Sequence, residues 1–305
     1  MRVMPWNNAR RLALRLALCV SALLPAQAQA QAGLAVTDDH GAVVRFEQAP
    51  RRVVSLLPSL TETVCQLGRC ERLVGVDRDS NYPASVQRLP RVGGGLDPNI
   101  EAIVALRPDV VLIASSARAA ERLQSLGLRV VALEPRTHAD IQRVVLTLAR
   151  LLEVPDAYKA WQAIDEGVSA AARSLPPSAR GARVYFEASA GPYAAGEASF
   201  IGETLARLGA VNIVAREMGP FPRINPEYVV RADPDVVMVG ERGAASIGQR
   251  PGWAQLRAVR EGRVCVFTPA QGDVLVRPGP RMAQAARLMA DCLAAKSPPA
   301  RERKP

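Results

Sequence analysis

The chain has 305 residues and a formal net charge of +10, from 39 Lys and Arg against 29 Asp and Glu. At roughly 150 residues per domain, this length allows about two domains, each large enough for a hydrophobic core. Only 4% of the residues are aromatic, and no block of Lys and Arg is interleaved with them, so the composition argues against a nucleic-acid-binding protein.

Residues 1–30 have the pattern of a secretory signal peptide. Four arginines precede or enter the apolar run of residues 12–24, and the segment ends in Ala-Gln-Ala. A membrane anchor is the alternative, but it needs about 20 apolar residues, and Arg15 and Pro25 interrupt and end this run. A lipid anchor on Cys19 is disfavoured because a bulky leucine precedes it. We therefore expect an exported protein that works in the periplasm.

Short β-branched runs alternate with helical patterns from residue 53 onward, which predicts parallel sheets built from βα units. In the first half the predicted strands are Val53–Leu57, Leu73–Val76, Val110–Ala114 and Val130–Leu133, and the predicted helices are Ser59–Leu67, Ile100–Leu106 and Ala117–Leu126. The spacing of Ser59 and Glu62 is that of a capping box, so we expect a helix to start there.

Four cysteines remain after export, an even number in a compartment where disulfides persist. Cys65 and Cys70 are five residues apart and are expected to join a helix end to the following strand by a disulfide. Cys265 and Cys292 lie in apolar segments. They are able to pair, but two buried free thiols fit the sequence equally well.

A helical pattern from Asp156 to Leu175 separates the two halves, with no Gly-rich or Ser-rich linker. A helix of this length spans about 30 Å and would act as a stiff strut that limits hinge closure between two lobes. The predicted parts are the N-terminal lobe, the backbone helix, the C-terminal lobe and a disordered basic tail, at residues 31–152, 153–176, 177–296 and 297–305.

The second half repeats the first. Its predicted strands are Arg183–Phe186, Asn212–Val214, Val236–Gly240 and Val264–Phe267. At a constant offset of 126, Asn99, Glu101, Pro108, Asp109, Val110 and Val111 recur as Asn225, Glu227, Pro234, Asp235, Val236 and Val237. The fold class is therefore α/β, with two Rossmann-like lobes, each around a parallel sheet, joined by one long helix.

Glu101 and Glu227 each open a helix at the same place, two residues after an asparagine. One interpretation is a carboxylate that stabilises the positive end of a helix dipole, which contributes about 0.3–1 kcal/mol. The other is a pair of acidic contacts, one per lobe, for a two-fold symmetric partner with basic sockets. The repetition favours the second interpretation, because a cap tolerates Ser or Thr whereas a docking pair must stay charged.

Ligands of doubly wound sheets bind outside the carboxyl ends of the strands. The loops that follow the predicted strands hold a candidate set of ligand-binding residues, namely Pro58, Ser59, Tyr82, Gly94, Tyr193, Phe221, Arg242, Asp273 and Arg277. Loop packing is the alternative role for Tyr193 and Phe221. Asp273 and Arg277 are interpreted either as polar contacts to a ligand or as a mutual surface ion pair of little energetic consequence.

Motifs for catalysis are missing from the sequence. It has no Gly-x-Ser-x-Gly, no Gly-x4-Gly-Lys and no Gly-x-Gly-x-x-Gly. With two isolated histidines, His40 and His138, and no Cys-x-x-Cys, we expect neither a metal site made by protein ligands nor a cofactor. An exported α/β enzyme stays open as the alternative of another class, and it would need a base and a nucleophile within hydrogen-bond reach.

Two segments resemble a known family. Residues 50–62 read Pro-Arg-Arg-Val-Val-Ser-Leu-Leu-Pro-Ser-Leu-Thr-Glu, and residues 99–109 read Asn-Ile-Glu-Ala-Ile-Val-Ala-Leu-Arg-Pro-Asp. They are similar to the class III periplasmic solute-binding proteins, which have a long backbone helix and serve ABC importers of cobalamin, haem and iron–siderophores. The likeness covers residues 35–293 and is greatest to the cobalamin-binding members.

This resemblance implies that Glu101 and Glu227 contact arginines of a transmembrane permease dimer, and that a monomeric protein holds its ligand between the lobes. It matches Phe221 and Tyr193 to cleft aromatics and Asp273 and Arg277 to polar contacts with a corrin edge. The expected cargo is a cobalamin-like corrinoid. One alternative is haem, bound through Tyr193 or Tyr82. The other is a ferric siderophore, bound through Arg78, Arg242 or Arg277.

The sequence also departs from the cobalamin-binding pattern. Tryptophans of that pattern are replaced by Gly or Ala around Gly94 and Ala114, which predicts a less aromatic pocket. Cys292 matches a family cysteine whose partner falls near Leu208, and the pair Cys65 and Cys70 is additional.

Overall fold

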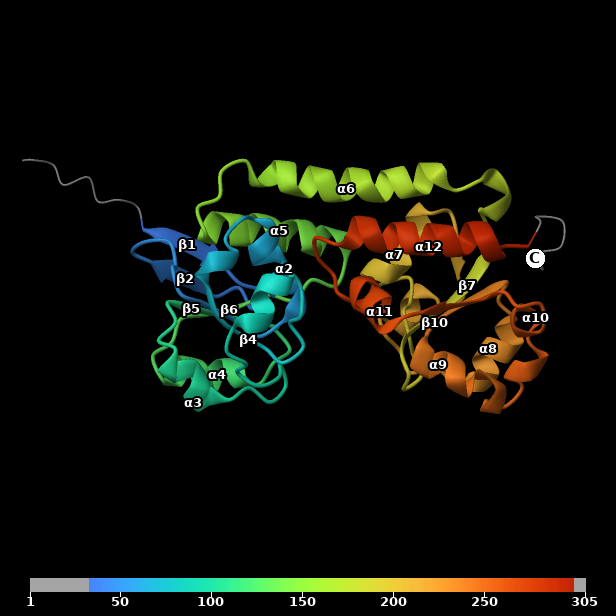
Figure 1. Ribbon diagram of the computed structural model, residues 1–305, viewed down its shortest axis with the longest axis horizontal. Coiled ribbons are helices and arrows are strands. Elements are labelled where there is room, and N and C mark those ends of the chain that lie inside the picture. The colour runs from blue at the N-terminus through green and yellow to red at the C-terminus, as the bar shows by residue number, and fades with distance from the viewer. Residues whose placement is uncertain (1–32, 299–305) are drawn as a thin grey trace, which may run out of the picture. The chain divides into compact units, whose positions relative to one another are not determined.

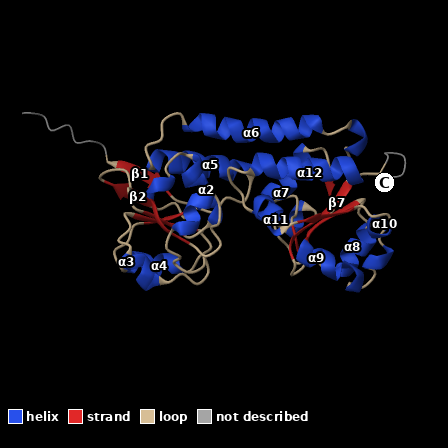
Figure 2. Ribbon diagram, viewed as in Figure 1, coloured by secondary structure: helices blue, strands red, loops and turns tan. Residues whose placement is uncertain are grey.

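The computed structural model describes residues 33–298. The predicted signal peptide and most of the predicted basic tail therefore lie outside the described residues. The described chain forms two α/β lobes, each built around its own sheet (Figure 1, Figure 2). No helix within residues 33–298 has both the length and the apolar character that crossing a membrane requires.

The sheet of the N-terminal lobe is parallel, with the strand order β4-β3-β5-β6. Its strands are β3 (Val53–Ser55), β4 (Leu73–Val76), β5 (Val110–Ile113) and β6 (Val130–Ala132), preceded by a hairpin of β1 (Leu34–Thr37) and β2 (Val43–Phe46). One face packs against α2 (Pro58–Gln66) and α5 (His138–Leu151), and the other against α3 (Ile100–Ala105) and α4 (Ala119–Ser125). Burial on both faces explains why these strands are runs of β-branched residues.

The C-terminal lobe has the same strand order. Its parallel strands are β7 (Arg183–Ser189), β9 (Val211–Asn212), β10 (Val236–Gly240) and β11 (Val264–Phe267), arranged β9-β7-β10-β11, and β8 (Tyr193–Ala194) pairs antiparallel with β7. Its helices are α7 (Phe200–Arg207), α8 (Pro226–Ala232), α9 (Glu241–Ser246), α10 (Arg257–Arg260), α11 (Pro269–Val276) and α12 (Met282–Lys296). The predicted strand at residues 212–214 begins one residue earlier, at Val211; the other predicted strands are confirmed within three residues at each end.

The repeated Pro-Asp pair has the same role in both lobes. The Asp109 carboxylate accepts the backbone N–H groups of Arg51 and Arg52, both at 2.8 Å, just before β3. At the equivalent place, the Asp235 carboxylate accepts the N–H of Arg183 at 2.9 Å where β7 begins. Each aspartate thus fixes the start of its central strand, so the repeat in the sequence is a repeat of structure.

The predicted strut is α6 (Ala157–Ser174), which is about 27 Å long at 1.5 Å per residue. It buries Trp161, Ile164, Val168 and Ala171. Along its length α6 contacts both α5 of the N-terminal lobe and α12 of the C-terminal lobe (Figure 1). A single rigid helix therefore packs against both lobes.

The predicted capping box at the start of α2 is wrong. The helix begins at Pro58 and its N-cap is Leu57, which offers no side-chain cap. Proline is favoured at the first helical position, so Ser59 becomes the second helical residue instead of the cap. Glu62 does not turn back to the helix end; its carboxylate binds two arginines of the other lobe.

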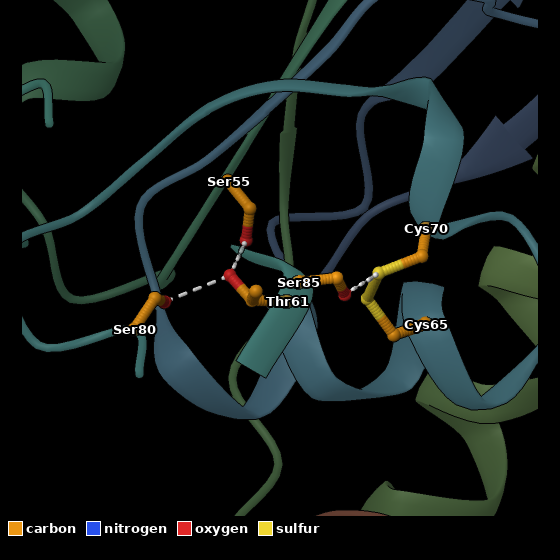
Figure 3. The surroundings of a disulfide bond; sticks show 6 residues. All are labelled: Ser55, Thr61, Cys65, Cys70, Ser80 and Ser85. Atoms are coloured by element: carbon orange, nitrogen blue, oxygen red, sulfur yellow. Dashed lines mark hydrogen bonds between the residues drawn. A yellow bond between two sulfur atoms is a disulfide. The ribbon is translucent and has the colours of Figure 1, made fainter. Parts of the chain in front are cut away.

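Two disulfides are present in the described chain. Cys65 and Cys70 are joined at the end of α2, as predicted, and the Cys70 sulfur lies 3.5 Å from the Ser85 hydroxyl (Figure 3). Cys292 of α12 is bonded to Cys265 of β11, with a Cα–Cα distance of 6.0 Å. Of the two possibilities left open by the sequence, pairing of Cys265 and Cys292 is therefore the one the structure shows, with α12 packed beside β11, and the departure from the family pattern at Leu208, a buried core residue, stands.

Removal of each disulfide should destabilise the protein according to the loop that it closes. With sequence separations of 27 for Cys265 and Cys292 and 5 for Cys65 and Cys70, the chain-entropy relation gives losses of about 3.5 and about 2 kcal/mol. Urea denaturation of the two double Cys→Ser variants should therefore show the larger loss for Cys265 and Cys292. The reverse order would contradict loop closure as the source of stability.

Candidate functional site

A cleft opens where the lobes meet, and one half of it is polar. This half has a volume of about 460 Å³. Residues from the start of α2, from the loop after β4 and from the end of α11 line it, namely Leu57, Pro58, Ser59, Arg78, Asp79, Asn81, Asp273, Val276, Arg277 and Pro278. The first two groups follow the carboxyl ends of β3 and β4, where α/β sheets place their ligands.

The other half of the cleft is apolar, with a volume of about 340 Å³. It shares Leu57, Ser59, Val276 and Pro278 with the polar half and adds Glu134, Pro135, Arg136, Phe200, Pro220 and Phe221. The rings of Phe200 and Phe221 are 6.1 Å apart, and Phe221 is 38% exposed. The two cavities are thus adjoining parts of one cleft that offers an aromatic wall at one side and charged groups at the other.

Behind the polar half lies a buried charge cluster of Glu62, Arg277 and Arg281. Glu62 comes from α2 in the N-terminal lobe, and both arginines come from the segment between α11 and α12. The Glu62 carboxylate accepts Arg281 Nε at 2.7 Å, Arg281 Nη2 at 2.6 Å and Arg277 Nη1 at 3.0 Å. The three side chains are only 1%, 10% and 12% exposed, so this cluster joins the lobes through charges that water does not screen.

The same network extends to the lining of the polar half. Arg277 also donates to Asn81 Oδ1 at 2.8 Å and to the Asp79 carbonyl at 3.0 Å. Asp273 Oδ1 lies 2.9 Å from Arg277, and Asp273 Oδ2 accepts Asn81 Nδ2 at 2.8 Å. Asp273 and Arg277 form the mutual ion pair that one interpretation expected, but it is not a surface pair, because the Arg277 side chain is only 10% exposed and also binds Glu62.

Glu134 gives the apolar half one charged group. Burial tends to raise the pKa of this carboxyl, but hydrogen bonds from Ser116 and Ser115 outweigh it, and its pKa lies below the ordinary value. Arg136 lies 3.4 Å away. Glu134 therefore carries its negative charge at neutral pH.

Of the predicted ligand-binding residues, Pro58, Ser59, Phe221, Asp273 and Arg277 line the cleft, and the other four line neither half. Tyr82 is 48% exposed beside the charge cluster, with the Arg281 guanidinium 4.4 Å from its ring centroid. Gly94 is buried against the ion pair of Arg78 and Asp97. Tyr193 is exposed on β8, and Arg242 is exposed on α9.

Several lining residues were not among the predicted ones. Pro135 and Arg136 follow β6, so the rule about strand ends, applied to that strand as well, would have found them. Phe200 begins α7, and Pro220 lies in a loop before α8. No local pattern marks either of them as part of a cleft.

Glu101 and Glu227 occupy equivalent exposed positions in the first turns of α3 and α8. The asparagines before them do the capping: Asn99 Oδ1 accepts the Ala102 N–H and Asn225 Oδ1 accepts the Glu227 N–H, both at 2.9 Å. Neither glutamate forms an ion pair with a described residue. The glutamate carboxylates are thus not needed as hydrogen-bonded caps.

The described cleft has no arrangement for nucleophilic catalysis. Among the residues that line the cleft, Ser59 is the one with a hydroxyl group. No described group accepts a hydrogen bond from this hydroxyl, so Ser59 has no base to activate it. His138 lies outside the lining. Its Nε2 is 2.9 Å from Thr204 Oγ1, and burial lowers its pKa. Within residues 33–298, no three His, Cys, Asp or Glu side chains are placed to hold a metal ion.

Comparison with known proteins identifies the family. Residues 53–270 match the family described as periplasmic binding protein. The chain belongs to this family. The members of this family are solute-binding proteins and not enzymes, and this chain is one of them.

Three known proteins are similar to this chain over most of their own length. An ABC transporter substrate-binding lipoprotein of Bacillus subtilis is 26% identical over 85% of this chain and 84% of its own. The vitamin B12-binding protein of Pectobacterium carotovorum is 28% identical over 82% and 90%. A periplasmic heme-binding protein of Pseudomonas aeruginosa is 27% identical, with a TM-score of 0.68 over 82% and 95% of the two chains. The two-lobe fold of class III binding proteins is thus shared.

Proposed function

We propose that this periplasmic binding protein captures a cobalamin-like corrinoid as a monomer and delivers it to the permease of an ABC importer. The observation that supports this cargo is the division of the cleft into an apolar half around Phe221 and a polar half around Asp273 and Arg277. A corrinoid has an apolar macrocycle with polar side chains at its edge. The vitamin B12-binding relative and the substrate-binding lipoprotein support the cargo class and the importer.

The shape of the site suits a large rigid ligand. The two halves have volumes of about 460 and about 340 Å³, within the range of ligand sites, and they share four lining residues. Because α6 contacts both lobes, the protein does not depend on a wide hinge motion to enclose its cargo. A large ligand that fills an open cleft fits this architecture.

Haem is the second candidate, and Tyr82 favours it. Its side chain is 48% exposed, with the Arg281 guanidinium 4.4 Å from the ring centroid, so its phenol oxygen is accessible as an axial ligand beside the cleft. A ferric siderophore is less well supported. Of the three arginines expected to bind it, Arg277 is bound to Glu62 and Arg242 lies outside the lining, so Arg78 remains, paired with Asp97. Arg136 in the other half of the cleft is a further exposed cation.

Titration of the mature protein with cyanocobalamin, haemin and a ferric siderophore, by calorimetry and absorbance, tests the cargo. We expect cyanocobalamin to bind most tightly. Tight binding of haemin without binding of cyanocobalamin would overturn the corrinoid proposal, and loss of haemin affinity in Tyr82→Phe would then identify the axial ligand.

Phe221→Ala should weaken cyanocobalamin binding about tenfold or more, because it removes an aromatic surface from the apolar half of the cleft. The matched control is Tyr158→Ala, which removes an exposed aromatic residue of α6 and should leave the dissociation constant unchanged. Equal affinities of the two variants would place the cargo outside the apolar half.

A further inference from the structure

Ser59 has a buried hydroxyl that no described residue satisfies. The residue is 2% exposed, and its Oγ has no hydrogen-bond partner within residues 33–298. Ser59 is also one of the four residues that line both halves of the cleft. A buried polar group without a partner is costly, so a hydroxyl at this position indicates a partner that arrives from the cleft.

Neighbouring buried hydroxyls show that the local fold does satisfy such groups. Thr61 Oγ1 donates to Ser55 Oγ at 2.8 Å, and Ser80 Oγ donates to Thr61 Oγ1 at 2.9 Å (Figure 3). On α2 itself, Thr63 Oγ1 donates to the Ser59 carbonyl at 2.7 Å. Among these buried hydroxyls around α2, the one that lacks a partner is that of Ser59, at the cleft.

The position of Ser59 in α2 determines which kind of group it would bind. This nine-residue helix has no side-chain cap, and its N–H groups at Leu60 and Thr61 already donate to the Leu57 carbonyl at 3.0 and 3.1 Å. The Ser59 N–H has no such acceptor among the described residues. Ser59 therefore presents an O–H and an N–H at the positive end of a helix, a combination that favours an oxygen acceptor.

We propose that Ser59 is a specificity-determining contact, whose hydroxyl and backbone N–H donate to one oxygen acceptor on the cargo, an amide carbonyl or a carboxylate. The inference rests on the proposed function and adds the chemistry of one contact. Leu57, Val276 and Pro278 line both halves together with Ser59, so the contact would lie among apolar side chains. A ligand without an acceptor would leave the hydroxyl unpaired.

Ser59→Ala in the mature protein tests the contact. We expect the dissociation constant for cyanocobalamin to rise about fivefold to tenfold, with no fall in the melting temperature of the ligand-free protein, because the lost hydroxyl has no intramolecular partner. The matched control is Thr61→Val, which removes a hydroxyl bonded within the fold. It should lower the melting temperature and leave the affinity unchanged.

Haemin distinguishes the two acceptors, because its edge carries carboxylates where a corrinoid carries amides. The wild-type protein could bind haemin and not cyanocobalamin, and Ser59→Ala could then weaken haemin binding. That result would support a contact between Ser59 and a carboxylate. It would overturn the corrinoid cargo but not the contact. Unchanged affinity of Ser59→Ala for a ligand that the wild type binds would overturn the contact while the binding function stands. Failure of the wild type to bind any of the three ligands would overturn both.

Discussion

Glu62→Ala should lower the free energy of unfolding by about 3–5 kcal/mol. The substitution leaves Arg281 buried without the carboxylate that it binds, next to Arg277, which keeps its ion pair with Asp273. These arginines belong to the C-terminal lobe and Glu62 to the N-terminal lobe. The substitution therefore weakens the interface between the two lobes. Urea denaturation of the mature protein, followed by circular dichroism, measures it.

A surface ion pair provides the control for this prediction. Glu166 pairs with Arg173, and their side chains are 68% and 64% exposed. Glu166→Ala should change the free energy of unfolding by less than about 1 kcal/mol, because solvent screens the pair. If Glu62→Ala costs no more than Glu166→Ala, the buried cluster does not hold the lobes together.

The framework of the fold follows from the sequence because local patterns determine it. Strands such as Val110–Ile113 and Val236–Gly240 are β-branched runs buried on both faces, and their chemistry is visible without knowledge of their neighbours. The repeat at a constant offset then predicts that both lobes share one architecture, and the sheets have the same strand order. Helix α6 was predicted because its apolar residues keep helical spacing over 18 residues.

The contacts of the site could not be predicted in the same way, because they join residues far apart in the sequence. Glu62 is separated from Arg277 by 215 positions, and its spacing from Ser59 imitates a capping box, so the local pattern was misleading. Cys292 likewise bonds to Cys265, since α12 lies beside β11 in this fold. Strand ends indicate where a cleft lies, but the loop conformations decide which side chains enter it, and Tyr193 and Arg242 do not.

Glu101→Ala combined with Glu227→Ala should abolish import of the cargo and leave its dissociation constant unchanged. Both carboxylates are exposed, neither forms an ion pair with a described residue, and neither lines the cleft. Their caps are made by Asn99 and Asn225, so the substitutions should also leave the melting temperature nearly unchanged. Uptake in cells that depend on this protein, measured beside titration of the purified variant, checks the two expectations together.

The single variants Glu101→Ala and Glu227→Ala separate the contributions of the two glutamates to docking. If the two glutamates bind equivalent arginines of a symmetric permease dimer, each single substitution removes one of two matched contacts, and binding to the permease should weaken by a similar factor in both. That binding should also weaken as salt concentration rises, since contacts between exposed charges are screened. Glu166→Ala is again the control, as an exposed carboxylate of α6 outside the repeat. Loss of ligand affinity in the double variant would place the glutamates in the binding site, and import at the wild-type rate would rule out their role in docking.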